Sequence, residues 1–456
     1  MEKMTLEKTV AIFLEEKKYK TLRDVITVMQ PFDIAQMFDE MTNDKRIVLF
    51  RLLPKELAAE VFVLLDEDVQ QQLISGFTDS EIAAVINEMY VDDVADMIEE
   101  MPASVVKRVL GQASSDMRKM INEVLKYPDD SAGSLMNTEY ISLRSTMTVE
   151  EALLHIRKTG IDKETLNTLY VLGNSRTLIG VLPIRMLIFA NPQDVIENIM
   201  DKSEIVTVHT LDDKENVARA FENYDLTELP VVDKENRLVG IVTVDDAIDV
   251  LQEEATEDIE KMAAISPSDK PYLKMSAIEI FSKRIPWLLI LMISATFTGI
   301  IISAFESALG ILPILTAFIP MLMNTGGNCG SQSSVTVIRS LSLEDIEFKD
   351  IFRVLFKEFR VSIYCGIALS IVSFGKVYLI DKLIMGKEIT VMVALVVSIT
   401  LLATVIISKL VGCSLPFIAK KLGFDPTVMA SPFITTIIDA LSLLIYFGFA
   451  SAILNL

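Results

Sequence analysis

Long apolar stretches occupy the carboxyl-terminal part of the chain, and each is close to the length that a helix needs to cross a bilayer. A crossing takes about 20 residues of helix. Because short charged segments separate the stretches, the pattern predicts an all-α transmembrane domain of five helices at residues 285–456. The predicted spans lie near 286–306, 309–336, 356–380, 389–413 and 427–453.

Residues 1–130 carry a different pattern, in which apolar residues recur three and four positions apart in short segments such as IAQMFDEM and VADMIEEM. The residues that separate these segments include Pro31, Pro54, Asp79 and Pro102. The spacing predicts a stack of short helices, an acidic α-helical domain of superhelical form. It ends in the sequence YPDDSAGSLM, where Pro, Gly and small residues interrupt the periodicity.

Two segments after this break repeat each other with a period of about sixty residues. Met136 to Ile188 and Ile199 to Leu251 both alternate as strand, helix, strand, turn, strand and helix. Gly180 and Gly240 stand at equivalent places, before the β-rich runs GVLPI and GIVTV. The repeat resembles a tandem pair of CBS domains, which are small α+β regulatory modules. We assign the repeats to residues 131–198 and 199–254, and the resemblance implies dimerisation and a nucleotide or an ion in the cleft between them.

Charge is distributed very unevenly along the chain. Residues 1–280 hold 29 Lys and Arg against 53 Asp and Glu, a balance of −24, whereas residues 281–456 hold 13 against 10, a balance of +3. An acidic soluble half argues against nucleic acid as a partner, because phosphate contacts require an excess of cationic side chains. It favours cation binding, although an acidic surface also serves solubility alone.

Cysteine and histidine usage narrows the possible chemistry. Cys329, Cys365 and Cys413 all lie in the apolar half without a paired spacing, so we assign them to packing. His155 and His209 are the two histidines of the chain, too few for a histidine-built metal site. The sequence contains no HExxH, GxSxG or Walker motif, and we therefore expect no enzyme.

Loop charges predict how the chain is oriented in the cell membrane. The segments 339–360 and 420–421 are basic, whereas the loop 381–388 is balanced. By the positive-inside rule the basic segments are cytosolic and the balanced loop is external. The start, MEKMTLEKTV, lacks the apolar core of a signal peptide. We therefore expect a multi-pass protein of the plasma (inner) membrane with a cytosolic amino terminus and an external carboxyl terminus.

Polar residues interrupt the second predicted span. They are Asn324, Thr325, Gly326, Gly327, Asn328, Gly330, Ser331 and Gln332. Glycines at this density allow a membrane helix to unwind, and free carbonyls beside amide side chains would line a hydrated cation pathway. The alternative is a helix-packing motif, because Gly326 and Gly330 are four residues apart and small residues let helices approach closely.

Asp439 is the acidic residue that lies deep in the last predicted span. A carboxylate there is costly unless it faces water, a cation or a proton relay. Thr435 and Thr436 precede it by four and three residues, so the three side chains share roughly one face. This arrangement suits a largely hydrated Mg²⁺ ion, which releases its water reluctantly. Lys376 and Lys409 lie close enough to a membrane face for us to expect their amines to snorkel to it.

The order of these segments resembles the MgtE-type magnesium transporters over essentially the whole chain. The most specific parts are NTGGNCGSQS, TVDDAIDVLQEEATEDIEKM, and a last span that opens with FDP and bears Asp439. The resemblance implies a homodimeric Mg²⁺-selective channel that closes when cytosolic Mg²⁺ is high. It also implies that Asp439 flanks the ion, that residues 324–332 support the pathway, and that a connecting (plug) helix at residues 255–284 leads into the first span.

The same resemblance assigns regulatory Mg²⁺ to carboxylates of the cytosolic half. They correspond to Glu60, Asp92 and Asp96 in the helical domain, Glu215, Asp225 and Asp246 in the second repeat, Glu254, Glu257 and Asp258 in the connecting helix, and Asp425 at the membrane face. Carboxylates on separate domains repel one another, and a bridging divalent ion turns the repulsion into attraction. Glu254, Glu257 and Asp258 are three and four residues apart and project towards one side of their helix, which is destabilising unless a cation intervenes. The alternative is a solvated acidic helix, and it is the resemblance that favours a sensor.

Two other classes of protein fit parts of the pattern. A CBS-regulated secondary transporter of another divalent cation would couple flux to an ion gradient and use Asp439 as a proton relay. A CBS-regulated membrane enzyme would need a nucleophile or a metal triad. Dependence of flux on an ion gradient separates a carrier from a channel, and turnover of a soluble substrate identifies an enzyme.

Overall fold

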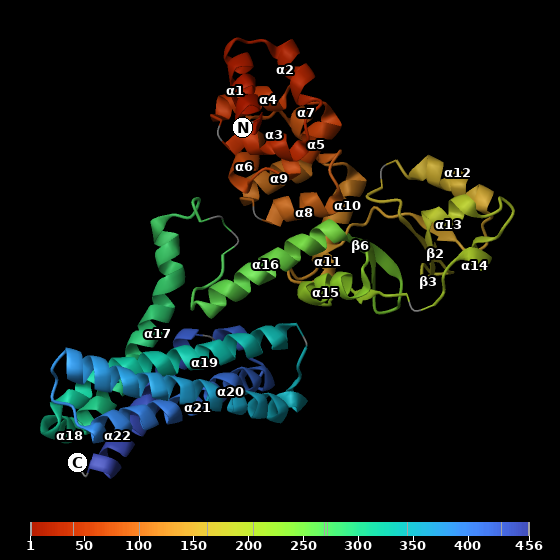
Figure 1. Ribbon diagram of the computed structural model, residues 1–456. Coiled ribbons are helices and arrows are strands. Elements are labelled where there is room, and N and C mark those ends of the chain that lie inside the picture. Colours follow the sequence, from red (N-terminus) through yellow and green to blue (C-terminus); the bar gives the residue numbers. More distant parts are fainter. Residues whose placement is uncertain are drawn as a thin grey trace. The chain divides into compact units, whose positions relative to one another are not determined.

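The computed structural model describes residues 2–39, 41–99, 101–161, 163–203, 205–268, 270, 272–343, 345–429 and 431–454 (Figure 1). The chain forms two compact units, Met1–Leu251 and Gln252–Leu456. The first unit holds a helical domain followed by two small sheets with their helices. The second unit is helical.

The helical domain is a stack of short helices, as the periodicity predicts. Helix α3 packs on α5, α5 on α7 and α7 on α9, while α4 packs on α6 and α8 on α10. Phe50 lies at the centre of the core, edge-on to Phe38 and Phe62 and 5.0 Å from the ring centre of Phe77. The helices are α1 (Glu2–Glu15), α2 (Tyr19–Ile26), α3 (Pro31–Asp39), α4 (Asn43–Phe50), α5 (Lys55–Val63), α6 (Glu67–Gly76), α7 (Asp79–Ile86), α8 (Val91–Glu99), α9 (Ala103–Gln112) and α10 (Ser115–Val124).

The residues that separate the apolar segments mark helix starts. Pro31 is the first residue of α3, and Pro54 and Pro102 are the N-cap residues of α5 and α9. Proline suits these positions because its missing N–H would have no partner in the first turn. Asp79 opens α7 directly after Thr78, whose hydroxyl accepts a hydrogen bond from the backbone N–H of Glu81.

Two three-stranded sheets follow with the same topology. In each sheet the first strand pairs parallel with the second and the second pairs antiparallel with the third. The predicted order of elements is therefore confirmed. The first module contains α11 (Ala132–Leu135), β1 (Ser142–Arg144), α12 (Val149–Thr159), β2 (Thr168–Leu172), β3 (Leu178–Pro183), α13 (Ile184–Phe189) and α14 (Ile196–Ile199). The second contains β4 (Val208–His209), α15 (Lys214–Tyr224), β5 (Glu228–Val232), β6 (Leu238–Thr243) and α16 (Val244–Met262), which continues into the second unit.

The equivalent glycines of the repeat serve the same packing role. A Cβ atom at Gly180 would lie 2.5 Å from Sδ of Met200, and one at Gly240 would lie 2.8 Å from Sδ of Met136. Each glycine thus lets a methionine from outside its strand pair cover the sheet. The repeat is visible in the sequence because both modules need a glycine at the same strand position to make room for a methionine.

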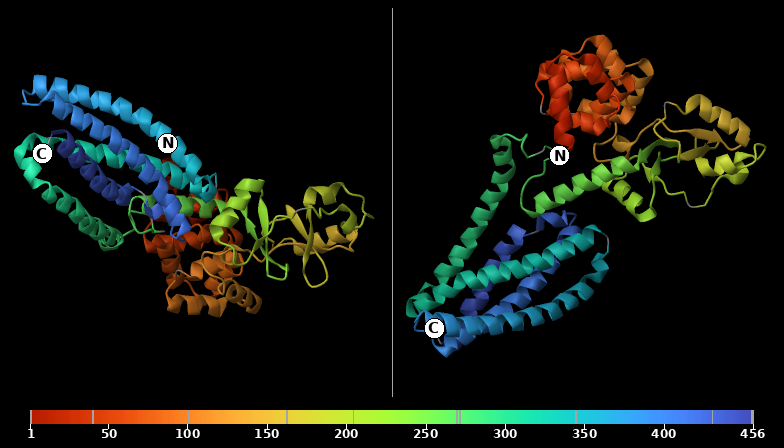
Figure 2. Two further views of the ribbon diagram at one scale, coloured as in Figure 1. Left: turned by 90° about the horizontal axis from the view of Figure 1, so that it is seen from below. Right: turned by 45° about the horizontal axis from the view of Figure 1, so that its top comes forward.

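The second unit is a bundle of long helices. Helix α19 packs against α21 and α22, α20 packs against α21, and α17 packs against α22, so these helices run side by side (Figures 1 and 2). The elements are α17 (Ala277–Ala304), α18 (Glu306–Ile311), η1 (Pro313–Phe318), α19 (Ile319–Ser342), η2 (Phe348–Asp350), α20 (Ile351–Gly375), the π-helix η3 (Lys376–Ile384), α21 (Val391–Lys421), η4 (Pro426–Met429) and α22 (Ser431–Leu454).

Two expectations for the second predicted span are wrong. The range 309–336 is not one helix, because α18 ends at Ile311 and α19 begins at Ile319. Pro313 and Pro320 each lie in the first turn of a new helical segment, where proline is tolerated. Residues 324–332 are not unwound either, since α19 is an unbroken α-helix of 24 residues.

Among the described residues, four helical segments are long and apolar enough to cross a membrane. Helix α19 is absent from this set because its amides and hydroxyls lower its hydropathy. The four segments are Ala277–Ala304, Phe348–Ile384, Val391–Lys421 and Pro426–Leu454.

The predicted connecting helix at 255–284 is interrupted. Helix α16 ends at Met262 and α17 begins at Ala277. None of the residues 263–268 and 272–276 is helical. Ser276 caps α17, with its hydroxyl accepting a hydrogen bond from the backbone N–H of Glu279, so the first span has a start of its own.

Candidate ion pathway and regulatory sites

Helix α19 has two chemically distinct faces. Asn324, Asn328, Gln332 and Thr336 follow one another at intervals of four residues, and all four are exposed. Side chains at this spacing lie above one another on one face of a helix. The amide of Asn328 donates a hydrogen bond of 3.3 Å to the side-chain oxygen of Asn324. We call this row of four residues the amide face.

The glycines of α19 lie on other faces and are buried. A Cβ atom at Gly326 would lie 2.8 Å from Oγ of Ser442 on α22 and 2.8 Å from the methyl group of Thr404 on α21. A Cβ atom at Gly330 would lie 2.0 Å from a methyl group of Ile438. Close packing therefore explains Gly326 and Gly330, as the alternative interpretation of the sequence proposed.

Helices α19 and α21 touch backbone to backbone. A Cβ atom at Gly412 would lie 2.3 Å from the carbonyl oxygen of Gly330. Sequence analysis missed Gly412, because a single glycine in an apolar run carries no periodic signal.

Asp439 lies on α22, one turn beyond Thr435. Thr435 itself packs on α19, because a Cβ atom at Gly327 would lie 2.6 Å from its methyl group. The carboxylate of Asp439 is partly buried, and its Oδ1 has no hydrogen-bond partner within the described part of the chain. The hydroxyl of Thr436 donates a 3.1 Å hydrogen bond to the carbonyl oxygen of Pro432 and is thereby used within α22.

The two intramembrane lysines do not behave alike. Lys376 is half-exposed, and its amine lies 2.7 Å from Oδ2 of the buried Asp381. Lys409 is buried, with its amine 3.4 Å from Oε2 of Glu358. The expectation that Lys409 snorkels is therefore wrong, since its charge is neutralised inside the bundle by a residue 51 positions away.

Acidic side chains gather between the helical domain and the CBS pair. Asp92 of α8 and Asp246 of α16, two of the predicted regulatory carboxylates, belong to this acidic cluster, and Asn137 donates hydrogen bonds to Asp92 Oδ1 at 3.1 Å and to Glu164 Oε2 at 3.0 Å. Sequence analysis missed four members, because nothing local marks residues that only the tertiary fold brings together. They are Asp93, Glu139, Glu164 and Asp245.

Burial and mutual repulsion disfavour the charged form of the carboxylates in the acidic cluster. Burial, and then repulsion from Asp93, Asp246 and Glu164, raise the pKa of Asp92 well above its ordinary value. Burial and the neighbouring carboxylates raise the pKa of Asp93 to about 6 and that of Glu164 to about 8. Burial also raises the pKa of Asp246, against an opposing hydrogen bond from Thr243. The cluster therefore favours a proton or a cation.

The remaining predicted regulatory carboxylates of the first unit occupy other surroundings. Glu60 on α5 and Asp96 on α8 are exposed. Glu215 pairs with Arg219 one turn along α15. Asp225 is exposed and ends α15 in the left-handed conformation, at φ 51°.

The end of α16 is held to the loop before α22 by a lysine. The amine of Lys261 lies 2.5 Å from Oε1 of Glu257 and 2.8 Å from Oδ2 of Asp425, whose other oxygen accepts hydrogen bonds from Thr427. Burial opposes the charge of Lys261, but the two carboxylates outweigh it and raise the pKa of the amine. Burial likewise opposes the charge of Asp425, yet Lys261 and Thr427 lower its pKa. Glu254 and Asp258 lie partly exposed on the same helix.

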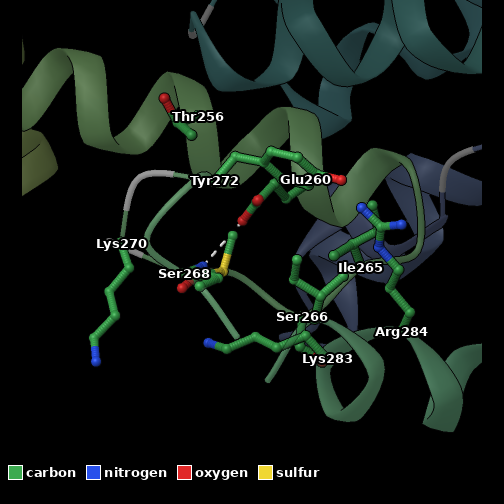
Figure 3. A pocket seen from close by; sticks show the side chains of 11 residues that line it. Thr256, Glu260, Ile265, Ser266, Ser268, Lys270, Tyr272, Lys283 and Arg284 are labelled. Atoms are coloured by element: carbon green, nitrogen blue, oxygen red, sulfur yellow. Dashed lines mark hydrogen bonds between the residues drawn. The ribbon is translucent and has the colours of Figure 1, made fainter. Parts of the chain in front are cut away.

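A pocket of about 340 Å³ lies where α16 passes into α17 (Figure 3). Its charged lining includes Glu260, Lys270, Lys283 and Arg284, and Glu260 accepts a 3.0 Å hydrogen bond from the backbone N–H of Ser268. None of the predicted regulatory carboxylates lines it. Nowhere in the described part of the chain do three His, Cys, Asp or Glu side chains stand close enough to hold one metal ion.

Comparison with known proteins agrees with this layout. A family model described as a divalent cation transporter matches residues 319–449, one described as the MgtE intracellular N domain matches 29–130, and the CBS domain model matches 132–192 and 196–253. The magnesium transporter MgtE of Thermus thermophilus is 37% identical over 446 residues, covering 97% of each chain. That of Bacillus subtilis is 34% identical over 446 residues, covering 98% of this chain and 97% of the other.

A solved structure resembles the part of the chain that holds the helical domain and the CBS pair. It is the cytosolic domain of the Mg²⁺ channel MgtE in complex with ATP, which is 37% identical, has a TM-score of 0.51 and covers 54% of this chain and 99% of its own. An acidic helical domain, a CBS pair and a helical bundle with an amide-bearing helix thus define a membrane transporter of divalent cations. The chain belongs to the MgtE family of magnesium transporters, and it is a transporter, not an enzyme.

Proposed function

We propose that the chain is a Mg²⁺-selective channel of the plasma membrane that closes when cytosolic Mg²⁺ rises. The observation that carries this proposal is the amide face of α19, four polar side chains exposed along one line of a helix whose other faces are packed. Exposed amides are costly against lipid and are retained where they meet water, an ion or another polar surface. In this proposal they border a hydrated ion pathway.

Helix α19 serves as the second span along the chain and brings the number of spans to five. Its 24 residues extend about 36 Å, enough for a hydrocarbon core of about 30 Å. It packs on α21 and α22, two helices that are apolar enough to cross by themselves. Five spans put the two termini on opposite sides of the membrane, and the basic segments 339–360 and 420–421 support a cytosolic amino terminus and an external carboxyl terminus.

The pathway lies between two copies of the chain. One copy leaves the amide face uncovered, and a twofold axis beside it would set two such faces and two Asp439 carboxylates around one line. Two carboxylates with amide and hydroxyl neighbours suit a Mg²⁺ ion that keeps much of its water. We assign Asn324, Asn328, Gln332, Thr435 and Thr436 to the lining, and Gly326, Gly327 and Gly330 to the packing that places it.

Cytosolic Mg²⁺ closes the channel by binding the regulatory carboxylates. The acidic cluster around Asp92 and Asp246 disfavours its own charged form, so a divalent ion stabilises the docked helical domain. Glu254, Glu257 and Asp258 of α16 act with Asp425 in the same way at the membrane face. Glu60, Asp96, Glu215 and Asp225 are the further candidates, each exposed or held by one local partner. A nucleotide occupies the cleft of the CBS pair, by analogy with the relative that was solved with ATP.

The test is Mg²⁺ flux into liposomes that contain the purified protein. We expect flux at micromolar Mg²⁺ on the cytosolic face and more than tenfold less at several millimolar. Asp439→Asn removes the charge at nearly constant volume, and we expect it to lower flux more than tenfold at both concentrations. Normal flux through Asp439→Asn would show that the pathway lies elsewhere, and flux that ignores cytosolic Mg²⁺ would show that the carboxylates sense another ligand.

A CBS-regulated secondary transporter of another divalent cation is the second candidate. The partly buried Asp439, with an oxygen that lacks a hydrogen-bond partner among the described residues, favours it, because a proton-coupled carrier needs a carboxylate that changes its protonation. A pH gradient that drives uphill Mg²⁺ accumulation supports the carrier. Flux that follows the Mg²⁺ gradient and membrane potential alone supports the channel.

A further inference from the structure

Three helices of the bundle meet at one buried ion pair. The hydroxyl of Ser333 on α19 donates a 2.7 Å hydrogen bond to Oε2 of Glu358 on α20, and it accepts one of 3.1 Å from the amine of Lys409 on α21. The amine also lies 3.4 Å from the same carboxylate oxygen. Side-chain exposure is 7% for Lys409 and 17% for Glu358, so water screens neither charge well.

The pair lies close to the proposed pathway but on the packed side of α19. Ser333 is buried, whereas its neighbour Gln332 is exposed on the amide face. The two sides of one helix are about 10 Å apart. In a low-dielectric bundle a charge acts strongly over that distance, and most strongly on a divalent ion.

We propose that Glu358 is a positioning residue of the Mg²⁺ pathway: it neutralises Lys409, whose amine would otherwise repel the ion from the amide face. This inference rests on the proposed function, because it requires the ion to pass along α19. Lys409 in turn fixes Ser333, one turn after the contact between Gly330 and Gly412. The pair thus holds three helices together without leaving a net charge beside the pathway.

The inference predicts opposite effects for the two halves of the pair. Glu358→Gln leaves an unpaired cation, and we expect Mg²⁺ flux to fall at least tenfold. Lys409→Met leaves a carboxylate that attracts the ion or takes up a proton, and we expect flux between one-third of the wild-type value and several times that value. The double variant Glu358→Gln/Lys409→Met carries no charge at this site. Proteins commonly tolerate the replacement of a buried ion pair by uncharged groups, so we expect its flux to be within threefold of wild type.

A purely structural role would give a different pattern. The two single variants would then lose flux alike, and this result overturns the inference, as does wild-type flux through Glu358→Gln. The matched control is Lys357→Met, which removes an exposed lysine next to Glu358 and should conduct like wild type. If Glu358→Gln is not recovered folded, Lys409→Met still decides, because flux below one-third of wild type contradicts a repulsive role for the amine.

One further variant separates this inference from the proposed function. Asn328→Leu removes an amide from the pathway without touching the ion pair, and the proposed function expects a loss of flux. Normal flux through Asn328→Leu contradicts the amide-face pathway itself. Lost flux there, together with equal losses in Glu358→Gln and Lys409→Met, contradicts the neutralising role alone.

Discussion

At the scale of single residues, small side chains decide how the bundle packs. Gly326, Gly327 and Gly330 each face a side chain of α21 or α22 at a distance that a methyl group would violate. The same glycines carried two interpretations in the sequence, because glycine both weakens a helix and lets helices approach. The neighbouring helices decide between them, and their positions are not encoded locally.

Gly412→Ala should destabilise the bundle. The added Cβ would lie 2.3 Å from the backbone carbonyl oxygen of Gly330, which is unable to move without shifting α19. We expect a loss of about 1–3 kcal/mol, typical of overpacking, seen as earlier thermal unfolding in detergent. Gly448→Ala on α22 is the control, since nothing lies within 4 Å of its added methyl group and alanine favours a helix. Equal unfolding temperatures for the two variants would contradict the close contact.

Buried charges also belong to this scale, and the sequence predicts them poorly. Asp439 and Lys409 are conspicuous in apolar runs, yet the partner of Lys409 is a glutamate on another helix. Asp92 and Asp246 were predicted from the family resemblance, whereas Asp93 and Glu164 become notable only once folding buries them together. Contacts between residues far apart in the chain produce no periodic pattern in the sequence.

At the scale of elements, the acidic cluster makes the docking of α8 depend on pH. The docked form raises the pKa of Glu164 from about 4.5 to about 8, so it binds a proton that the undocked form releases. Docking is therefore strongest below about pH 4.5, weakens as the pH rises to about 8 and changes little above that. In Mg²⁺-free buffer we expect the protection factors of residues 91–99, which compare each amide's hydrogen exchange with its intrinsic rate at the same pH, to be lower at pH 8 than at pH 6, and millimolar Mg²⁺ to remove the difference.

Glu164→Gln tests the origin of this dependence. The amide still accepts the hydrogen bond from Asn137 but carries no charge. At pH 8 without Mg²⁺ we expect slower exchange of residues 91–99 than in the wild type, and a smaller response to added Mg²⁺. Exchange identical to the wild type under both conditions would show that repulsion within the cluster does not control docking.

The ion pairs of Lys261 with Glu257 and Asp425 hold the end of α16 to the loop before α22, and we call them the latch. They give a second prediction at this scale. Lys261 attracts Glu257 and Asp425 without any metal. In Lys261→Met the two carboxylates repel each other, so without Mg²⁺ we expect faster proteolysis of the segment between α16 and α17, and protection when Mg²⁺ is added. Lys261→Arg keeps the charge and serves as the control. Unchanged cleavage of Lys261→Met would contradict the latch.

At the scale of the whole molecule, the repeat and the bundle differ in how well sequence predicts them. The CBS pair follows from a period that both modules obey, down to the equivalent Gly180 and Gly240. The apolar stretches predict the long helices of the bundle, but they give the wrong bounds for α19, as a span at 309–336, because its amides lower its hydropathy. Neither signal predicts the proposed arrangement of two copies, because a single chain shows only the face that a second copy would cover.

Cross-linking tests that arrangement. We expect Asn328→Cys, in a background with Cys329, Cys365 and Cys413 replaced by alanine, to form a covalent dimer in membranes with a short bismaleimide. The control is Tyr364→Cys on α20, whose 73% exposed side chain lies on another helix of the bundle. Equal dimer yields for both positions, or none for Asn328→Cys, would contradict a pathway between two amide faces.

The polar α19 also has a practical consequence for anyone who labels this protein. A hydropathy scan of the described residues finds four crossings and returns the carboxyl terminus to the cytosol, where a fused green fluorescent protein matures and an alkaline phosphatase stays inactive. Counting α19 reverses both outcomes, so the fluorescent fusion should be dark and the phosphatase fusion active. In the proposed five-span topology, one helix rich in amides thereby determines which reporter can follow this transporter in a living cell.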